Sequence, residues 1–481
     1  MTTSHSKVYM WSAIDRITVS VIGLGGNIIF ANLLSASDFG LLAMVAIFSA
    51  LAYNLSSCGL SDGLIQKEHP TGRDYSTVMS FNGAFGLFFC ILFILLSQPL
   101  SDYFNQPALV NILCCIGVCF FFQTLTFVQE ARMRKELQMK NLCIIHILSS
   151  TTSLGLGLYF ALNGFGYWAL VSTQVFLSFF TFIYTILISR WMPRIAFYKD
   201  SFNSMFGYGF NLMLSYILST ISRNISNFAL GRNNATSAGL FSQAQKMEEV
   251  PFSFTEMTFC NSFFPILSNE TDPHRKRELC NNMISFMSLF NISVALLMVL
   301  LSTPAFNLLF GHKWDASIPV FRVLVVFGTL FVLKQFFQTM LKAYGYAKPI
   351  RDITVCEVIL QLILLYLALP HGIVAVAWSQ DISIFIIFGI NVAYFAKISE
   401  SSFLHMMKLM LTPLVIPVAA FLLAGAGYMF AWTGLNPLST CILNAITFCT
   451  LCIIGWEIFP HSIYTKYRTL FISKISVLKQ K

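Results

Sequence analysis

The stretch TVMSFNGAFGLFFCILFILLSQ, from Thr77 to Gln98, carries no charged side chain over 22 residues. An α-helix rises about 1.5 Å per residue, so about 20 mostly apolar residues cross the ~30 Å hydrocarbon core of a bilayer. The stretch therefore predicts a membrane-spanning helix, and similar runs recur along the chain. The candidate spans are 8–34, 38–61, 77–98, 107–129, 142–162, 167–189, 206–231, 237–263, 281–303, 315–341, 353–369, 372–396, 409–431 and 437–458.

The composition of the 481 residues agrees, with 56% hydrophobic side chains, 11% charged ones and a mean hydropathy of +0.70. A soluble domain carries roughly 25% charged residues because its surface faces water. We therefore predict an all-α integral membrane protein with about 14 transmembrane helices. No connection between apolar runs exceeds about twenty residues, which leaves no room for a water-soluble catalytic domain.

The twelve cysteines do not indicate a redox or metal site. Several of them, such as Cys90, Cys114, Cys115 and Cys452, lie inside apolar runs, where a cysteine behaves as a small hydrophobic side chain. Their spacing matches no metal-binding or disulfide pattern. We therefore expect no metal and no cofactor.

The basic residues predict how the chain is oriented. With the N-terminus in the cytoplasm, the even-numbered connections carry basic clusters near residues 67–73, 132–140, 190–199, 275–277, 342–351 and 397–408, and the tail adds more. The opposite connections hold only Arg232 and Lys313. Cytoplasmic loops are enriched in Lys and Arg, so we predict that both termini are cytoplasmic. The net charge of +9 is then a property of topology, and nucleic acid is not an expected partner.

Two internal similarities predict a duplicated architecture. FANLLSASDFGLL (Phe30–Leu42) is similar to FALGRNNATSAGLF (Phe228–Phe241), and FFQTL (Phe121–Leu125) to FFQTM (Phe336–Met340). They fall in predicted spans 1 and 7 and in spans 4 and 10, as a six-plus-six repeat requires. Chance similarity in apolar sequence is the alternative. The predicted division is a six-helix lobe over 1–205, a second six-helix lobe over 206–400, and two extra C-terminal helices with a basic tail over 401–481.

Charged residues inside predicted spans are the candidate functional residues, because each costs roughly 2.5–3.5 kcal/mol at the centre of a bilayer. Such side chains normally face protein or water. The candidate ion-coupling residues are the acids Glu249, Glu256 and Asp381. The candidate substrate-binding residues are the embedded bases Arg16, Arg223, Lys246, Arg322 and Lys334.

The eighth predicted span carries a polar stripe at helical spacing, formed by Ser242, Lys246, Glu249, Ser253, Glu256 and Cys260. Such a stripe is typical of a wall facing a water-filled space, and a helix–helix contact is the alternative. Each embedded base also has a structural alternative. Arg16 and Arg322 could reach the headgroups, and Arg223 and Lys246 could pair with acidic neighbours.

The motifs resemble those of one membrane protein family. They are WSAIDR (Trp11–Arg16), NLLSASDFGLLAM (Asn32–Met44), SSCGLSDGLIQK (Ser56–Lys67), NFALGR (Asn227–Arg232) and AGLFSQAQKM (Ala238–Met247). Together with the helix number, they resemble the Wzx-type (colanic-acid-exporter-like) polysaccharide flippases of the multidrug/oligosaccharidyl-lipid/polysaccharide exporter superfamily.

The resemblance implies movement of an undecaprenyl-pyrophosphate-linked oligosaccharide from the cytoplasmic to the periplasmic leaflet of the bacterial inner membrane. Two lobes would enclose a cationic cavity and alternate between inward-open and outward-open states. Arg16, within the WSAIDR motif, is the one site residue that the resemblance itself supplies. The implied partners are the lipid-linked oligosaccharide, membrane lipid and other polysaccharide assembly proteins.

Two other functions compete with this interpretation. A drug/cation antiporter of the same superfamily would favour acidic residues in its cavity. A multispan glycosyltransferase or polymerase would need clustered acids or histidines on a large loop, whereas the eight histidines here are scattered. We therefore do not expect an enzyme, and no catalytic residues are assigned.

Overall fold

The computed structural model describes residues 2–57, 64, 67, 69–256, 259, 263, 267, 270, 272–344, 346–431 and 436–459. The basic tail, Cys260 and most of the segment between Ser57 and Lys67 lie outside this described part. Within it every regular element is a helix, which confirms the all-α membrane fold. It divides into two compact units, Met1–Gln243 (unit 1) and Ala244–Lys481 (unit 2). The predicted three-part division is not decided by these units and stays a prediction.

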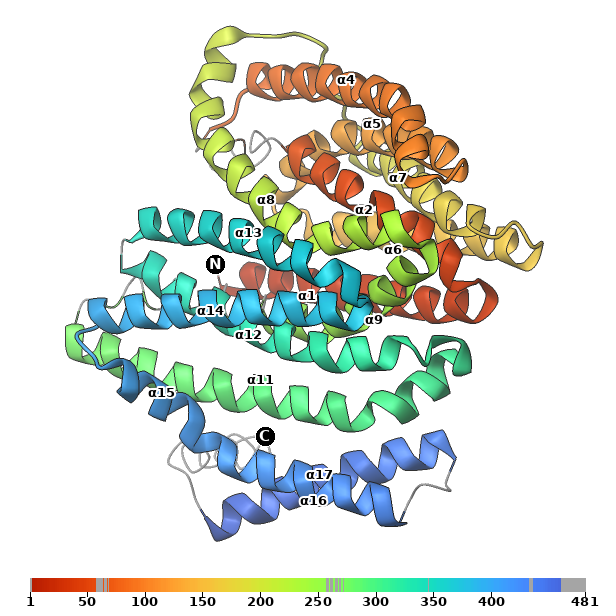
Figure 1. The fold of residues 1–481 in the computed structure, drawn as a ribbon. Helices are drawn as coiled ribbons and strands as arrows, with labels where there is room; N and C mark the ends of the chain where they lie inside the picture. The colour runs from red at the N-terminus through yellow and green to blue at the C-terminus, as the bar shows by residue number, and fades with distance from the viewer. Residues whose placement is uncertain are drawn as a thin grey trace. The chain divides into compact units, whose positions relative to one another are not determined.

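Unit 1 contains seven of the described helices and the first part of an eighth (Figure 1). The pairs α4–α5, α6–α7, α1–α6, α5–α7 and α2–α8 pack side by side. Apolar side chains such as Met44, Ile112 and Phe120 fill the core between them. The helices are α1 (Thr2–Leu33), α2 (Ala36–Ser57), α4 (Gly72–Phe104), α5 (Ala108–Lys135), α6 (Met139–Leu162), α7 (Trp168–Ser189), α8 (Lys199–Asn233) and α9 (Ala235–Thr255), and the unit boundary falls inside α9.

Unit 2 is organised around α12. In the most apolar stretch of this helix, 72% of the residues are buried, the largest share among the candidate membrane spans of the described residues. Helices α11 and α14 pack against α12, and α16 and α17 pack together against α11 (Figure 1). The helices and short 3₁₀ turns are α11 (Pro273–Phe310), η2 (His312–Trp314), α12 (Ser317–Ala343), α13 (Ala347–Ala368), η3 (Leu369–His371), α14 (Ile373–Ile398), α15 (Phe403–Leu411), η4 (Thr412–Leu414), α16 (Val415–Ala431) and α17 (Pro437–Ile458).

Eleven described segments are long and apolar enough to cross a membrane. Helices α2, α8 and α9 are not among them: for α2 only the stretch Ala36–Leu51 has described side chains, and α8 and α9 are rich in polar residues. The count of fourteen therefore stays a prediction. The outer surface of the spans is apolar, as lipid requires: on α13, Ile359, Ile363 and Tyr366 are 53%, 55% and 78% exposed at one-turn spacing.

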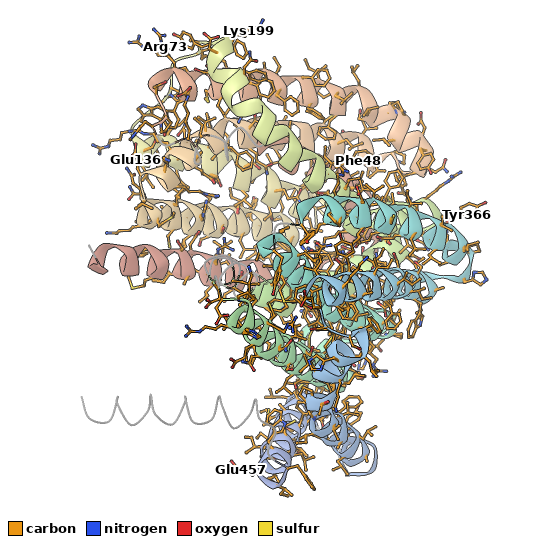
Figure 2. All side chains as sticks on the ribbon, turned by 90° about the vertical axis from the view of Figure 1, so that its left-hand side faces the viewer. Phe48, Arg73, Glu136, Lys199, Tyr366 and Glu457 are labelled. Carbon is orange, nitrogen blue, oxygen red and sulfur yellow. The ribbon has the colours of Figure 1, made fainter. Side chains whose placement is uncertain are left out.

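The basic connections of unit 1 gather at one end of the unit. Figure 2 labels Arg73, Glu136 and Lys199 there. Lys135 donates a hydrogen bond to the backbone oxygen of Lys67 at 2.7 Å. The Arg73 guanidinium lies 5.3 Å from the ring centre of Tyr198, which joins the start of α4 to the start of α8. The connections of unit 1 that are predicted to be cytoplasmic from their basic residues thus lie close together.

The α1–α2 and α8–α9 turns pack against each other through two glycines in unit 1. A Cβ atom added to Gly40 would lie 1.7 Å from the backbone oxygen of Ala235, and one added to Gly239 would lie 1.8 Å from that of Ala36. In each helix the glycine follows the alanine by four residues, so the two contacts are reciprocal. Small residues four apart allow backbones to approach closely.

Candidate functional site

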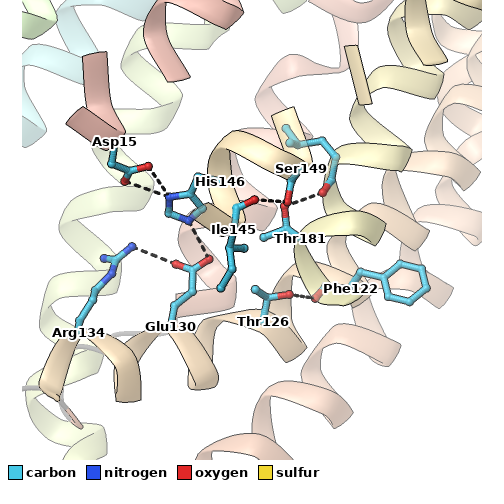
Figure 3. Close-up of polar contacts among 10 residues, drawn as sticks. Asp15, Phe122, Thr126, Glu130, Arg134, Ile145, His146, Ser149 and Thr181 are labelled. Atoms are coloured by element: carbon cyan, nitrogen blue, oxygen red, sulfur yellow. Dashed lines mark hydrogen bonds and ion pairs between the residues drawn. The ribbon is translucent and has the colours of Figure 1, made fainter. Parts of the chain in front are cut away.

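A chain of charged side chains joins α1, α5 and α6 in unit 1 (Figure 3). The Nδ1 atom of His146 lies 3.0 Å from each carboxylate oxygen of Asp15. Its Nε2 atom lies 3.6 Å from Oε1 of Glu130, and Glu130 accepts a 3.0 Å hydrogen bond from Arg134 through its other oxygen. The side chains of Asp15, Glu130 and His146 are 20%, 11% and 23% exposed. These groups are therefore largely shielded from solvent.

Local sequence explains why these groups meet. Beyond Gly117, helix α5 continues to Lys135 without Gly or Pro, which places Glu130 inside the helix. Glu130 then pairs with Arg134 one turn later, a spacing that favours an ion pair. Helix α1 approaches α6 closely at Gly26, where an added Cβ would lie 2.7 Å from a methyl carbon of Leu154. This approach brings Asp15 within reach of His146.

A cavity of about 270 Å³ adjoins the cluster, between residues of α1, α5, α6 and α7. Its wall is polar where Gln123 donates a 3.3 Å hydrogen bond to the hydroxyl of Ser178. Glu130 and His146 both line it, along with Thr126 and Thr181. The hydroxyl, amide and charged groups form part of a wall that also contains Val19, Phe127 and Leu177, and at these polar groups the space suits water.

The two basic candidates of unit 1 lie on different helices. Arg16 is exposed on α1, directly after Asp15. Arg223 is half-buried on α8. Neither belongs to the His146 cluster, which recruits Arg134 as its cation.

In unit 2, Lys334 of α12 forms a buried ion pair with Glu357 of α13. Its Nζ atom lies 2.8 Å from both carboxylate oxygens, and the two side chains are 5% and 7% exposed. The ammonium also lies 4.6 Å from the ring centre of Phe331. This geometry supports a structural role for Lys334 and leaves it less accessible than the other four bases.

The polar stripe of α9 is not uniformly exposed. Lys246 and Ser253 are exposed, Glu249 and Glu256 are half-buried, and Ser242 is buried. The helix continues through Pro251, and Glu256 stands in a π-helical turn directly after it. Its carboxylate accepts a 3.2 Å hydrogen bond from Gln335 of α12, and Glu249 accepts a 3.4 Å one from Gln245. π-Helical turns are frequent at functional sites.

The remaining two candidates lie apart from these pairs. Arg322 is exposed on α12 and donates to the hydroxyls of Ser302 at 2.8 Å and Thr303 at 2.7 Å on α11. Asp381 of α14 is 4% exposed, and its carboxylate oxygens have no side-chain hydrogen-bond partner within the described ranges. Over the same ranges, no three His, Cys, Asp or Glu side chains are placed to hold a metal ion.

The sequence analysis missed the His146 cluster. Glu130 was placed beyond the end of the fourth span, and the histidines were treated as scattered. One signal could have identified it: His146 lies inside an otherwise uncharged apolar run, and an ionisable residue there indicates a functional site.

Known proteins match most of the chain. The model of a family described as "polysaccharide biosynthesis protein" matches residues 29–319. The chain belongs to this family. The lipopolysaccharide biosynthesis protein WzxC of Escherichia coli (strain K12) is 25% identical over 66% of this chain and 66% of its own length, just under two thirds. The teichuronic acid biosynthesis protein TuaB of Bacillus subtilis (strain 168) is 24% identical over 85% and 87%.

Solved structures support the fold. The lipid II flippase MurJ in an inward closed conformation matches with a TM-score of 0.76, 13% identity, and coverage of 94% of this chain and all of that one. An inward-facing MATE-family multidrug transporter of the MOP superfamily matches with a TM-score of 0.61, 13% identity, and coverage of 82% and 99%. The chain is therefore a multi-pass membrane protein of a polysaccharide biosynthesis family, and it shares its fold with MurJ and with MATE-family transporters.

Proposed function

We propose that this protein moves an undecaprenyl-pyrophosphate-linked oligosaccharide from the cytoplasmic to the periplasmic leaflet of the bacterial inner membrane by alternating access. Membership of the polysaccharide biosynthesis family carries the proposal. The name of a further relative, the succinoglycan biosynthesis transport protein ExoT of Rhizobium meliloti, 21% identical, also refers to transport. The lipid is moved and not chemically altered, so the function needs no catalytic residue.

The embedded bases supply the chemistry that an anionic headgroup needs. A pyrophosphate accepts forked hydrogen bonds from Arg and a point charge from Lys. Arg16, Lys246 and Arg322 are the exposed residues among the five bases, and Arg322 also donates to Ser302 and Thr303. Lys334 is the weakest candidate for substrate contact, since Glu357 already neutralises it.

The experiment is a charge-neutralisation series in the host. Arg16→Gln, Arg223→Gln, Lys246→Gln and Arg322→Gln should each lower surface polysaccharide and raise the pool of its lipid-linked precursor. Charge reversal to Glu should be more damaging, because repulsion replaces attraction. Arg194→Gln removes the same charge from the exposed loop before α8 and is the matched control. Membrane abundance is measured for every variant.

A drug/cation antiporter is the second candidate, favoured by the MATE-family structural match and by the buried carboxylate of Asp381. The same strains decide between the two. If well-expressed variants keep normal polysaccharide and precursor levels but become sensitive to cationic dyes, the flippase proposal is wrong and the antiporter replaces it.

A further inference from the structure

His146 is placed between two acids, with one ring nitrogen facing each. Nδ1 lies 3.0 Å from both oxygens of Asp15, and Nε2 lies 3.6 Å from Oε1 of Glu130. A neutral imidazole has a single N–H group and would place a lone pair against one of the two carboxylates. The doubly protonated ring donates to Asp15 and also directs a positively charged N–H group at Glu130, an ion-pair contact at 3.6 Å. The geometry is therefore satisfied by the imidazolium form.

The charges around the ring also favour the imidazolium form of His146. With a proton on His146, two cations (His146 and Arg134) balance two anions (Asp15 and Glu130). Without that proton the cluster carries an uncompensated negative charge in a largely shielded place, which is costly. The neutral ring would lose one of its two contacts, either the one to Asp15 on α1 or the one to Glu130 on α5. The lost contact is where the free-energy cost arises.

The other groups near the ring do not supply the positive charge that would compensate the two carboxylates. Cys143 precedes His146 by one helical turn on α6, and its thiol is buried. Helix α7 contributes Leu177, Ser178 and Thr181 to the adjoining cavity, and none of these titrates in the physiological range. Lys140, nearer the start of α6, lies 5.9 Å from the ring centre of Trp11 on α1. This last contact is a second link between α1 and α6, independent of the proton.

The cavity provides access. His146 and Glu130 both line the 270 Å³ space, so water can reach the ring without a rearrangement of the helices. A proton can then arrive and leave while α5 and α6 both stay packed against α7.

We propose that His146 is a proton-binding site: the bound proton ties α1 to α5 and α6, which both pack on α7, and its release loosens α1. This inference goes beyond the proposed function, because proton occupancy and the position of α1 are measured without any transported substrate. Failure of one therefore leaves the other standing.

The proton is tested by nitrogen NMR of the full chain in lipid vesicles, with ¹⁵N in the histidine rings. At neutral pH, the signal present in the wild type and missing from His146→Gln should be that of a doubly protonated ring. The control, His371→Gln at the exposed η3 turn, should remove a different signal. In Asp15→Asn/Glu130→Gln, which keeps the ring, the His146 signal should become that of a neutral ring. A neutral His146 signal in the wild type overturns the proposal.

The link to α1 is tested with spin labels at Val21 on α1 and Tyr159 on α6, which are 64% and 61% exposed, in a background without native cysteines. At neutral pH the wild type should give one narrow distance distribution. Raising the pH, or introducing His146→Gln or Asp15→Asn/Glu130→Gln, should broaden it, and both variants should be insensitive to pH. A distribution that neither pH nor substitution changes overturns the proposal.

Discussion

Lys334 and Glu357 form a buried ion pair in unit 2, and the pair explains why an embedded lysine is tolerated on α12. Removing one partner of a buried pair leaves a charge without compensation, which costs roughly 3–5 kcal/mol. Replacing both partners by apolar residues removes that cost. The two residues are 23 positions apart, so their pairing depends on how α12 and α13 pack and could not be predicted from spacing.

We predict that Lys334→Met and Glu357→Gln each lower the thermal-unfolding temperature of the detergent-solubilised protein. The double variant Lys334→Met/Glu357→Leu should recover most of the loss and should keep polysaccharide export. A double variant that is stable but inactive would contradict the structural role and return Lys334 to the substrate-binding residues.

At the scale of elements, the contact between α2 and α9 explains the internal similarity of the sequence. The segments ASDFGLL (Ala36–Leu42) and ATSAGLF (Ala235–Phe241) align on their alanines and glycines, and these are the residues that touch. The similarity indicated a repeat, but it did not indicate that the two copies meet. Contact between distant segments depends on how the helices pack, and a comparison of two sequence segments does not contain that information.

We predict that Gly40→Ala and Gly239→Ala each destabilise the protein by about 1–3 kcal/mol, because the new methyl group would overlap backbone oxygens that cannot move cheaply. Gly23→Ala is the matched control: it lies in α1, where an added Cβ meets nothing within 4 Å. It should be neutral or slightly stabilising, since alanine favours a helix. Thermal unfolding measures all three, and equal behaviour of Gly40→Ala and Gly23→Ala would contradict the close contact.

At the scale of the molecule, the fold class was predictable because apolar runs are a one-dimensional signal. Thr77–Gln98 lies within α4, and the predicted spans 142–162 and 167–189 match α6 and α7 within a few residues. The hydropathy signal of the polar helices α8 and α9 is weaker, because residues such as Arg223 and Glu249 lower it. The sequence indicates the candidate residues by their charge within apolar runs, but it does not indicate which side chains they contact. Asp15 and His146 are 131 positions apart and meet only through α1–α6 packing.

The orientation of the whole molecule is tested by phosphatase fusions. Alkaline phosphatase fused after Phe165, in the loop between α6 and α7, should be active because that loop is predicted to be periplasmic. Fusions at Arg134, Lys276 and Lys397 should be inactive, since these basic connections are predicted to be cytoplasmic. Strong activity at any of the three would overturn both the orientation and the count of fourteen spans.

Leaflet exchange of the lipid is the measurement that tests the central claim most directly. Vesicles containing the purified full chain and lipid-linked oligosaccharide extracted from the host are treated with periodate, which cannot cross the bilayer and oxidises the exposed sugar. We predict that the whole pool becomes oxidised in the presence of the chain, under an imposed pH gradient or membrane potential. Vesicles without the chain should keep their inner-leaflet fraction protected. If that fraction stays equally protected with the folded chain under either gradient, the protein is not a flippase for this lipid.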